Sequence, residues 1–193
     1  MALSLSKGQQ ISLTKTSGKS LTSVRMGLGW DGIKKKGFLG FGAGREAVDL
    51  DANALLFNGA GELIDTVWFR QLRSKDGSVQ HSGDNRTGDG EGDDETITIN
   101  LQRLPQVVRT VILSVNNYSG QSFNRIETAY CRLVNIQGEQ ELARYELAGQ
   151  GQHNALIMAR LQREGDDWTF KAIGAVSSGR TFHDNLPDIH AHL

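Results

Sequence analysis

The chain has 193 residues, of which 38% are hydrophobic and 22% charged, and such proportions are typical of a folded globular protein. Its formal net charge of −1 excludes an overall electrostatic field that would recruit nucleic acid, so no nucleic-acid partner is expected. No stretch approaches the roughly 18 consecutive apolar residues of a membrane span. The length fits a single domain over residues 1–193, with a loose tail from about residue 180.

Most apolar segments are short, rich in β-branched residues and bounded by Gly, Asn or Asp, which is the pattern of strands. In chain order, strands are predicted over residues 10–14, 21–30, 47–57, 63–69, 96–101, 107–116, 126–135, 141–147, 155–162 and 168–176. Helical turns are expected near 101–106 and 122–125, and the tail from Asn185 is expected to be helical. This pattern predicts an all-β fold, an antiparallel two-sheet β-sandwich with short helical turns and a loose C-terminal tail.

Two aspartates lie on one predicted strand. Asp49 and Asp51 flank Leu50, and because side chains alternate along a strand, both carboxylates face one side while Leu50 faces the core. Neighbouring carboxylates repel each other unless they share a cation. Asp31, at the end of the preceding predicted strand, is a further candidate for the same group.

The most unusual segment is residues 84–95, which hold six of the 22 acids of the chain: Asp84, Asp89, Glu91, Asp93, Asp94 and Glu95. Arg86 is the one basic residue among them. Four glycines between positions 83 and 92 allow positive φ angles that turn backbone carbonyls inward. Calcium takes about 6–8 oxygen ligands in flexible geometry, whereas magnesium demands a strict octahedron. The segment therefore predicts a calcium site, and the alternative is a merely solvated acidic surface.

The predicted site combines this loop with the neighbouring strands and holds one or two Ca²⁺ ions. Its candidate ligands are Asp31, Asp49, Asp51, Asp84, Asn85, Gly88, Asp89, Gly90, Asp93, Asp94 and Glu95. It is not an EF-hand, because Arg86 and Gly88 occupy the third and fifth positions counted from Asp84, and Asp89 stands where the glycine belongs. Glu91 is expected to be solvated surface.

Motifs of catalysis are missing from the sequence. There is no Gly-x-Ser-x-Gly, no phosphate-binding Gly-x-x-x-x-Gly-Lys and no His-Glu-x-x-His, so the chain is not expected to be an enzyme. The single cysteine, Cys131, cannot form an internal disulfide and is expected to be a small structural residue within a strand, which favours a reducing cytoplasmic compartment. Residues 34–41, from Lys34 to Phe41, combine three lysines with apolar side chains. They predict either peripheral contact with an anionic membrane or partner, or a mobile solvated loop.

Three blocks of sequence, residues 27–31, 49–52 and 83–95, resemble the signature of the TerD family of tellurium-resistance and stress proteins. Residues 34–40, 67–69 and 179–181 look most like the TerZ branch of that family. The resemblance covers nearly the whole chain, although the Lys/Gly/Phe segment before Asp49 is longer than is common in the family. It implies a cytoplasmic calcium-binding β-sandwich that takes part in resistance to tellurite and other stresses. Family members are also linked to phage and colicin resistance.

The expected function is thus a non-enzymatic calcium-binding stress protein, cytoplasmic or peripheral to the inner membrane. Calcium would stabilise the composite site and gate docking to partners, namely other Ter-family proteins, membrane-associated proteins or the membrane itself. The alternative is a metal-dependent hydrolase or a detoxifying enzyme that acts on tellurium oxyanions, and the shortage of cysteines argues against direct reduction.

Overall fold

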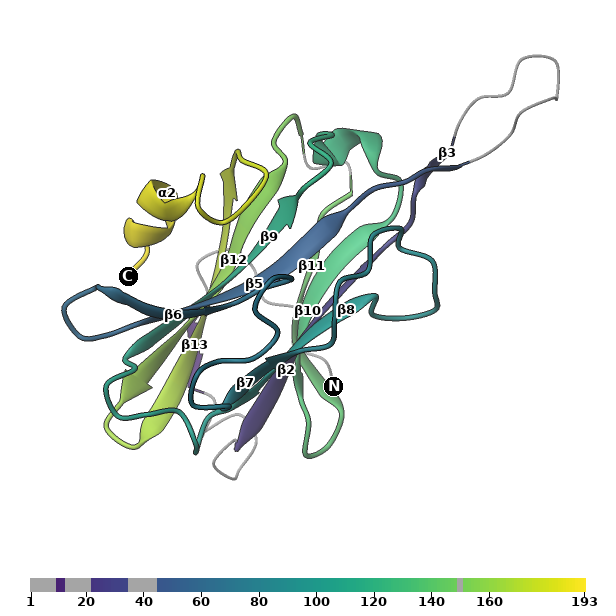
Figure 1. Ribbon diagram of the computed structural model, residues 1–193. Helices are drawn as coiled ribbons and strands as arrows, with labels where there is room; N and C mark the ends of the chain where they lie inside the picture. Colours follow the sequence, from purple (N-terminus) through teal and green to yellow (C-terminus); the bar gives the residue numbers. More distant parts are fainter. Residues whose placement is uncertain (1–9, 13–21, 35–44, 149–150) are drawn as a thin grey trace, which may run out of the picture.

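Two antiparallel sheets pack face to face in the computed structural model of the protein, which describes residues 10–12, 22–34, 45–148 and 151–193 (Figure 1). The larger sheet has the order β1-β13-β12-β9-β5-β6 and the smaller sheet the order β11-β10-β2-β8-β7. The larger sheet contains β1 (Gln10–Ser12), β5 (Leu50–Phe57), β6 (Leu63–Val67), β9 (Thr110–Asn117), β12 (Ala155–Glu164) and β13 (Asp167–Ser177). The smaller sheet contains β2 (Ser23–Trp30), β7 (Val79–His81), β8 (Glu95–Asn100), β10 (Ala129–Asn135) and β11 (Gln140–Glu146). The predicted β-sandwich is confirmed.

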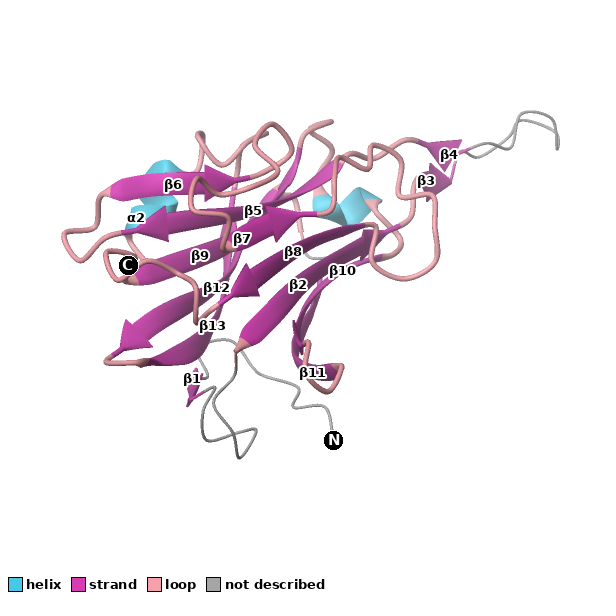
Figure 2. Ribbon diagram, turned by 60° about the horizontal axis from the view of Figure 1, so that its bottom comes forward, coloured by secondary structure: helices cyan, strands magenta, loops and turns pink. Residues whose placement is uncertain are grey.

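The core lies between the two sheets, where apolar side chains from alternate strand positions meet. Leu28 and Ile97 of the smaller sheet and Leu113 and Met158 of the larger sheet are fully buried there. Each such side chain contributes about 1.5–3 kcal/mol when it leaves water. Figure 2 shows the two layers side by side, with β5 and β9 in one and β2, β8 and β10 in the other.

The C-terminal segment covers the outer face of the larger sheet. Phe182 and Ile189, the latter in α2 (Leu186–His190), are buried against Phe57 and Ile112, whose side chains point away from the main core. Asn185 is buried as well, and its amide donates to Ser177 Oγ and to the Ser178 carbonyl. The helical prediction for the tail is confirmed, but the prediction that the tail is loose was wrong, because a second apolar cluster holds it on the sheet.

Short elements account for most other differences from the predicted strands. β7, β3 (Ile33–Lys34) and β4 (Arg45–Glu46) were missed, since two or three residues are too few to show alternation. Residues 101–106 form turns rather than a helix, whereas a 3-10 helix at Phe123–Arg125 agrees with the expected helical turn. In Figure 1, β3 extends away from the sandwich, and β3 and β4 pair with each other. Residues 35–44, and with them most of the predicted membrane-contact segment, lie outside the described residues.

Two further expectations concern burial and length. Cys131 is fully buried in β10, which agrees with a structural role. Within the described ranges, no helix has the length and apolar character required to cross a bilayer.

Candidate metal centre

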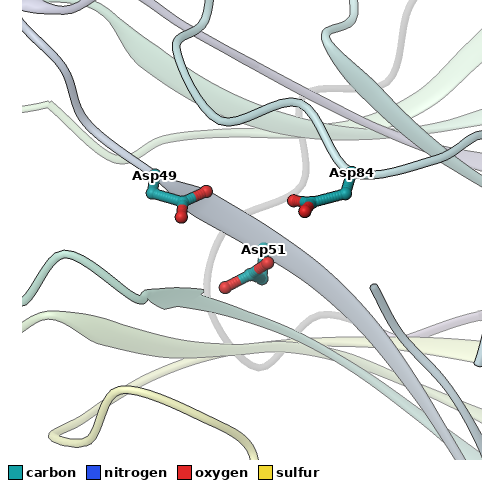
Figure 3. Close-up of side chains that lie close together, drawn as sticks. All are labelled: Asp49, Asp51 and Asp84. Atoms are coloured by element: carbon teal, nitrogen blue, oxygen red, sulfur yellow. The ribbon is translucent and has the colours of Figure 1, made fainter. Parts of the chain in front are cut away.

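Three aspartates from two parts of the chain converge at one end of the sandwich. Asp49 directly precedes β5, Asp51 is the second residue of that strand, and Asp84 lies in the loop between β7 and β8. One carboxylate oxygen of each lies within 4.8 Å of the others, and across the described part of the chain no other group of three or more His, Cys, Asp or Glu side chains meets that criterion. Figure 3 shows the three side chains directed toward one another. We call them the cavity aspartates.

Burial makes this arrangement electrostatically unfavourable without a cation or a proton. Asp51 is only 2% exposed, and its Oδ2 has no hydrogen-bond partner; Oδ1 of the half-buried Asp49 has none either. Burial, then the like charges of Glu95, Asp49 and Asp84, raise the pKa of Asp51 to about 9. Burial and Asp84 likewise raise the pKa of Asp49 to about 6, although Arg86 opposes the shift. Because unpaired buried carboxylates are strongly disfavoured, the arrangement favours a positive ligand.

An open cavity of about 230 Å³ adjoins these carboxylates. Besides the three cavity aspartates, it is lined by Phe69, Arg70, Arg86 and Tyr118. Its volume far exceeds what one ion or one water molecule needs. A cation bound to the aspartates would therefore face open space in which further ligands can reach it.

Glu95 holds the two parts of the site together. It is fully buried, and its carboxylate accepts hydrogen bonds from Ala52 N (2.9 Å) and Asn85 N (3.1 Å). β6 pairs with β5 only from Ala54 onward, so the first part of β5 has no strand neighbour on that side and Glu95 provides the acceptor. His81 Nε2 lies 3.3 Å from Glu95 Oε2. Glu95, predicted as a ligand, thus has both oxygens engaged by protein groups and joins β5 to the loop.

Trp30 supports the same junction through separate contacts. Its indole Nε1 donates to the Val48 carbonyl at 2.7 Å, directly before Asp49. Gly88 of the loop packs on the indole, with φ +66°, and a Cβ there would come within 2.5 Å of the ring. Asn85 shapes the loop in between, since its side-chain oxygen accepts from the N–H groups of Thr87 and Gly88, both at 3.1 Å. Asn85 and Gly88, both predicted as ligands, therefore have structural roles in the loop.

The last acids of the loop are bound by other protein groups. Arg132 donates to Asp93 through Nε (2.8 Å) and Nη2 (2.9 Å), and the Tyr130 hydroxyl donates to the same carboxylate at 3.0 Å. Asp94 Oδ2 accepts from Trp30 N at 2.9 Å, and Asp94 Oδ1 accepts from the Asn85 amide at 3.1 Å. We call Asp93, Asp94 and Glu95 the anchored acids. They do not join the group formed by the cavity aspartates.

Two glycines of β2 make room for this part of the loop. A Cβ at Gly29 would lie 2.6 Å from the Gly92 carbonyl oxygen, and a Cβ at Gly27 would overlap the Asp93 carboxylate. Asp94 N donates to the Leu28 carbonyl between them at 2.8 Å. Residues 27 and 29 of a strand face the same side, and because both are glycine, no side chain on that face of β2 obstructs the loop.

The remaining predicted ligands lie around Asp94. Burial raises the pKa of Asp94, and the nearby carboxylates of Asp31, Asp89 and Asp93 raise it further, while the hydrogen bond from Trp30 N lowers it. Asp31 and Asp89 are thus close enough to act on Asp94, but neither belongs to the group of three. Gly90 is exposed, and a Cβ there would approach only Asp94, at 3.3 Å.

Several residues of the site were not found from the sequence. Trp30 acts as a structural support, and Phe69, Arg70, Arg86 and Tyr118 line the cavity. The one available signal was Arg86, the single base within the acidic run. The others lie in separate segments, and only the folded chain brings them together.

Comparison with known proteins gives consistent matches over almost the whole chain. Residues 1–185 match the sequence profile of the family described as TerD domain. The chain is 49% identical to tellurium resistance protein TerZ of Serratia marcescens, over 97% of this chain and 96% of that protein. It is 37% identical to general stress protein 16U of Bacillus subtilis (strain 168), over 93% of each. Its fold is similar to that of a solved homologue of telluride resistance protein (TerD) from Streptomyces coelicolor A3(2), with a TM-score of 0.70 and 23% identity, over 82% of this chain and 92% of that one.

Proposed function

The chain belongs to the TerD domain family of tellurium-resistance and stress-response proteins, and from this premise we propose that it binds calcium at Asp49, Asp51 and Asp84. The observation that carries the proposal is Asp51, a carboxylate that is 2% exposed, has an oxygen without a hydrogen-bond partner and faces two further carboxylates. A divalent cation at this position removes both the repulsion and the loss of hydration.

The donor set favours a hard cation. All three side chains offer oxygen, and no His or Cys belongs to the group, so the site does not suit a transition metal that prefers nitrogen or sulfur. One aspartate within β5, one directly before it and one on a glycine-rich loop suit the irregular geometry of calcium better than the strict octahedron of magnesium. Backbone carbonyls, waters or another ligand would complete the coordination.

The ion is proposed to act by linking the two sheets. Asp51 belongs to β5 of the larger sheet and Asp49 directly precedes that strand, whereas Asp84 belongs to the loop that leads into β8 of the smaller sheet. A ligand that binds only the folded state stabilises it by RT ln(1 + [Ca]/Kd), which is about 2.7 kcal/mol when free calcium exceeds Kd a hundredfold. Calcium would thereby order the loop and strengthen the sandwich at one end.

We also propose that the role is not catalytic, for two reasons. The relatives are named for resistance and stress rather than for a reaction. Reduction of a tellurium oxyanion by a thiol is disfavoured, because the only cysteine, Cys131, is fully buried and its pKa is raised by that burial.

Calcium titration by calorimetry and thermal melting with and without chelator test the proposal. Chelator is expected to lower Tm, and the combined variant Asp51→Asn/Asp84→Asn is expected to bind calcium at least tenfold more weakly, a change of roughly 1.4 kcal/mol. Glu91→Gln is the matched control, since Glu91 is an exposed acid of the same loop outside the group of three. Absence of calcium-dependent heat together with identical melting curves in calcium and chelator would refute the proposal.

A further inference from the structure

The cavity beside the aspartates also contains two arginines. Arg70 and Arg86 line it together with Asp49, Asp51 and Asp84, although two arginines in an acidic pocket weaken cation binding. Within the described residues, neither guanidinium forms a hydrogen bond or an ion pair, although Arg86 is close enough to Asp49 to interact with it electrostatically. Both side chains are exposed at the cavity rim. Cation binding alone therefore does not account for these two residues.

Arg70 nevertheless lies beside two aromatic rings. Its guanidinium carbon lies 5.6 Å from the centre of the Trp68 ring and 5.3 Å from the centre of the Phe69 ring. The Phe69 ring in turn contacts Tyr118, edge to face, with 5.5 Å between centroids. Cation–π contacts of this kind restrict where a guanidinium lies while its N–H groups remain able to donate. Arg70 thus has N–H donors available at the cavity rim for an anionic ligand.

The sign of the charge in the cavity depends on the metal. With all five side chains ionised, three aspartates and two arginines leave one net negative charge, and a divalent cation converts it to one net positive charge. Three carboxylates that each supply one oxygen also leave positions open on an ion that takes about 6–8. The loaded cavity would therefore attract an anion that can reach both the ion and the arginines.

We propose that the metal-loaded cavity binds a phosphate group, which ligates the calcium ion and accepts hydrogen bonds from Arg70 and Arg86; this rests on the proposed calcium site. A tetrahedral phosphate has enough oxygens to contact a metal and a planar guanidinium at once, and calcium and arginine are both typical phosphate ligands. The volume of about 230 Å³ accommodates such a group, and the rings of Phe69 and Tyr118 form the wall beside it. The phosphate is either free in solution or part of a lipid headgroup.

Reciprocal coupling between the two ligands gives the test. The full chain is titrated with calcium by calorimetry, first in phosphate-free buffer and then with inorganic phosphate kept below the solubility limit of calcium phosphate. Phosphate is expected to tighten calcium binding roughly tenfold, within the usual range of coupling between sites. Arg70→Gln and Arg86→Gln are expected to bind calcium in phosphate-free buffer at least as tightly as the wild type, since each removes a repelling charge, but to lose the phosphate effect.

Arg103→Gln is the matched control, because Arg103 is an exposed arginine in the turn after β8, outside the cavity lining. Sedimentation with phosphatidylcholine vesicles that contain phosphatidic acid distinguishes the two sources of phosphate. Vesicle binding that needs calcium and both arginines, with no effect of inorganic phosphate, assigns a lipid headgroup. An effect of inorganic phosphate on calcium affinity, without calcium-dependent vesicle binding, assigns a soluble phosphate compound.

Two outcomes overturn the inference while the calcium site stands: normal calcium binding that neither inorganic phosphate nor phosphatidic acid affects, or a phosphate effect that persists in both arginine variants. If the wild-type chain binds no calcium in either buffer, the proposed function fails and this inference fails with it. Melting of each variant in chelator reports whether it is folded.

Discussion

The cavity aspartates and the anchored acids are the same kinds of residue, and Asp84 stands only nine positions before Asp93. Their surroundings are opposite. Asp93 accepts two hydrogen bonds from Arg132 and one from Tyr130, whereas Asp51 is 2% exposed and one of its oxygens has no partner. Acids of the first kind stabilise the fold as they are, whereas acids of the second kind destabilise it unless a cation or a proton neutralises them. The partners of an acid, rather than the local density of acids, therefore distinguish a candidate binding site from a structural contact.

The largest expected effect on stability comes from an anchored acid. Glu95→Ala removes the acceptor of two backbone N–H groups, the buried one of Ala52 and the partly buried one of Asn85. Unsatisfied buried donors cost about 1–3 kcal/mol each, so the free energy of unfolding should fall by about 2–5 kcal/mol. Urea unfolding measures this loss, which is expected with calcium and with chelator alike. Glu95→Gln keeps one acceptor oxygen and should lose less. A loss of unfolding free energy seen only in the presence of calcium would instead make Glu95 a calcium ligand, and the distinction between anchored acids and cavity aspartates would fail.

The next largest effect is expected for Asp51→Asn, which should be unfavourable to the calcium-bound protein and favourable to the calcium-free protein. Asp51→Asn should weaken calcium binding at least tenfold, or about 1.4 kcal/mol. In chelator it should raise Tm, because burial and neighbouring carboxylates raise the pKa of Asp51 to about 9. When the pKa of a carboxyl group is higher in the folded state than in the unfolded state, the group destabilises the fold increasingly as pH rises above the unfolded-state pKa. A neutral amide of the same shape does not ionise and removes that penalty.

Melting curves at neutral pH, recorded in calcium and in chelator, check the Asp51 prediction. The matched control is Asp94→Asn, which replaces an anchored acid that accepts a hydrogen bond from Trp30 N. Its Tm in chelator is expected to rise less than that of Asp51→Asn, because the hydrogen bond from Trp30 N offsets part of the burial and repulsion that raise the pKa of Asp94. A lower Tm of Asp51→Asn in chelator would contradict the view that this carboxylate is unpaired and strained without a cation.

The smallest effect is expected at Asp93. Asp93→Asn weakens the ion pair with Arg132, which is partly exposed and also paired with Glu141. Because solvent screens part of this pair, the loss of stability should be about 1 kcal/mol, with calcium affinity unchanged. A double-mutant cycle with Arg132→Gln isolates the pair energy. A tenfold loss of calcium affinity in Asp93→Asn would place this residue among the ligands instead.

Much of the architecture was predictable from local patterns. Alternation of apolar residues and turn residues between them identified most strands of the sandwich, because both signals act over a few neighbouring positions. The Asp-x-Asp spacing likewise predicted that Asp49 and Asp51 share one side of a strand, and their oxygens do lie close together. The sequence also predicted that the loop after residue 83 meets that strand, and Asp84 does so.

Tertiary structure alone decided which acids have partners. Nothing near Asp93 in the sequence indicates Arg132, and nothing near Glu95 indicates Ala52 N, since these contacts depend on how β2, β5 and β10 are arranged around the loop. Arg70 and Tyr118 reach the cavity in the same way, from segments far apart in the chain. Local periodicity thus determines which residues form strands and which face they occupy. The charge balance of a site is a sum over residues distant in sequence, and only the packed sandwich brings them within a few ångströms of one another.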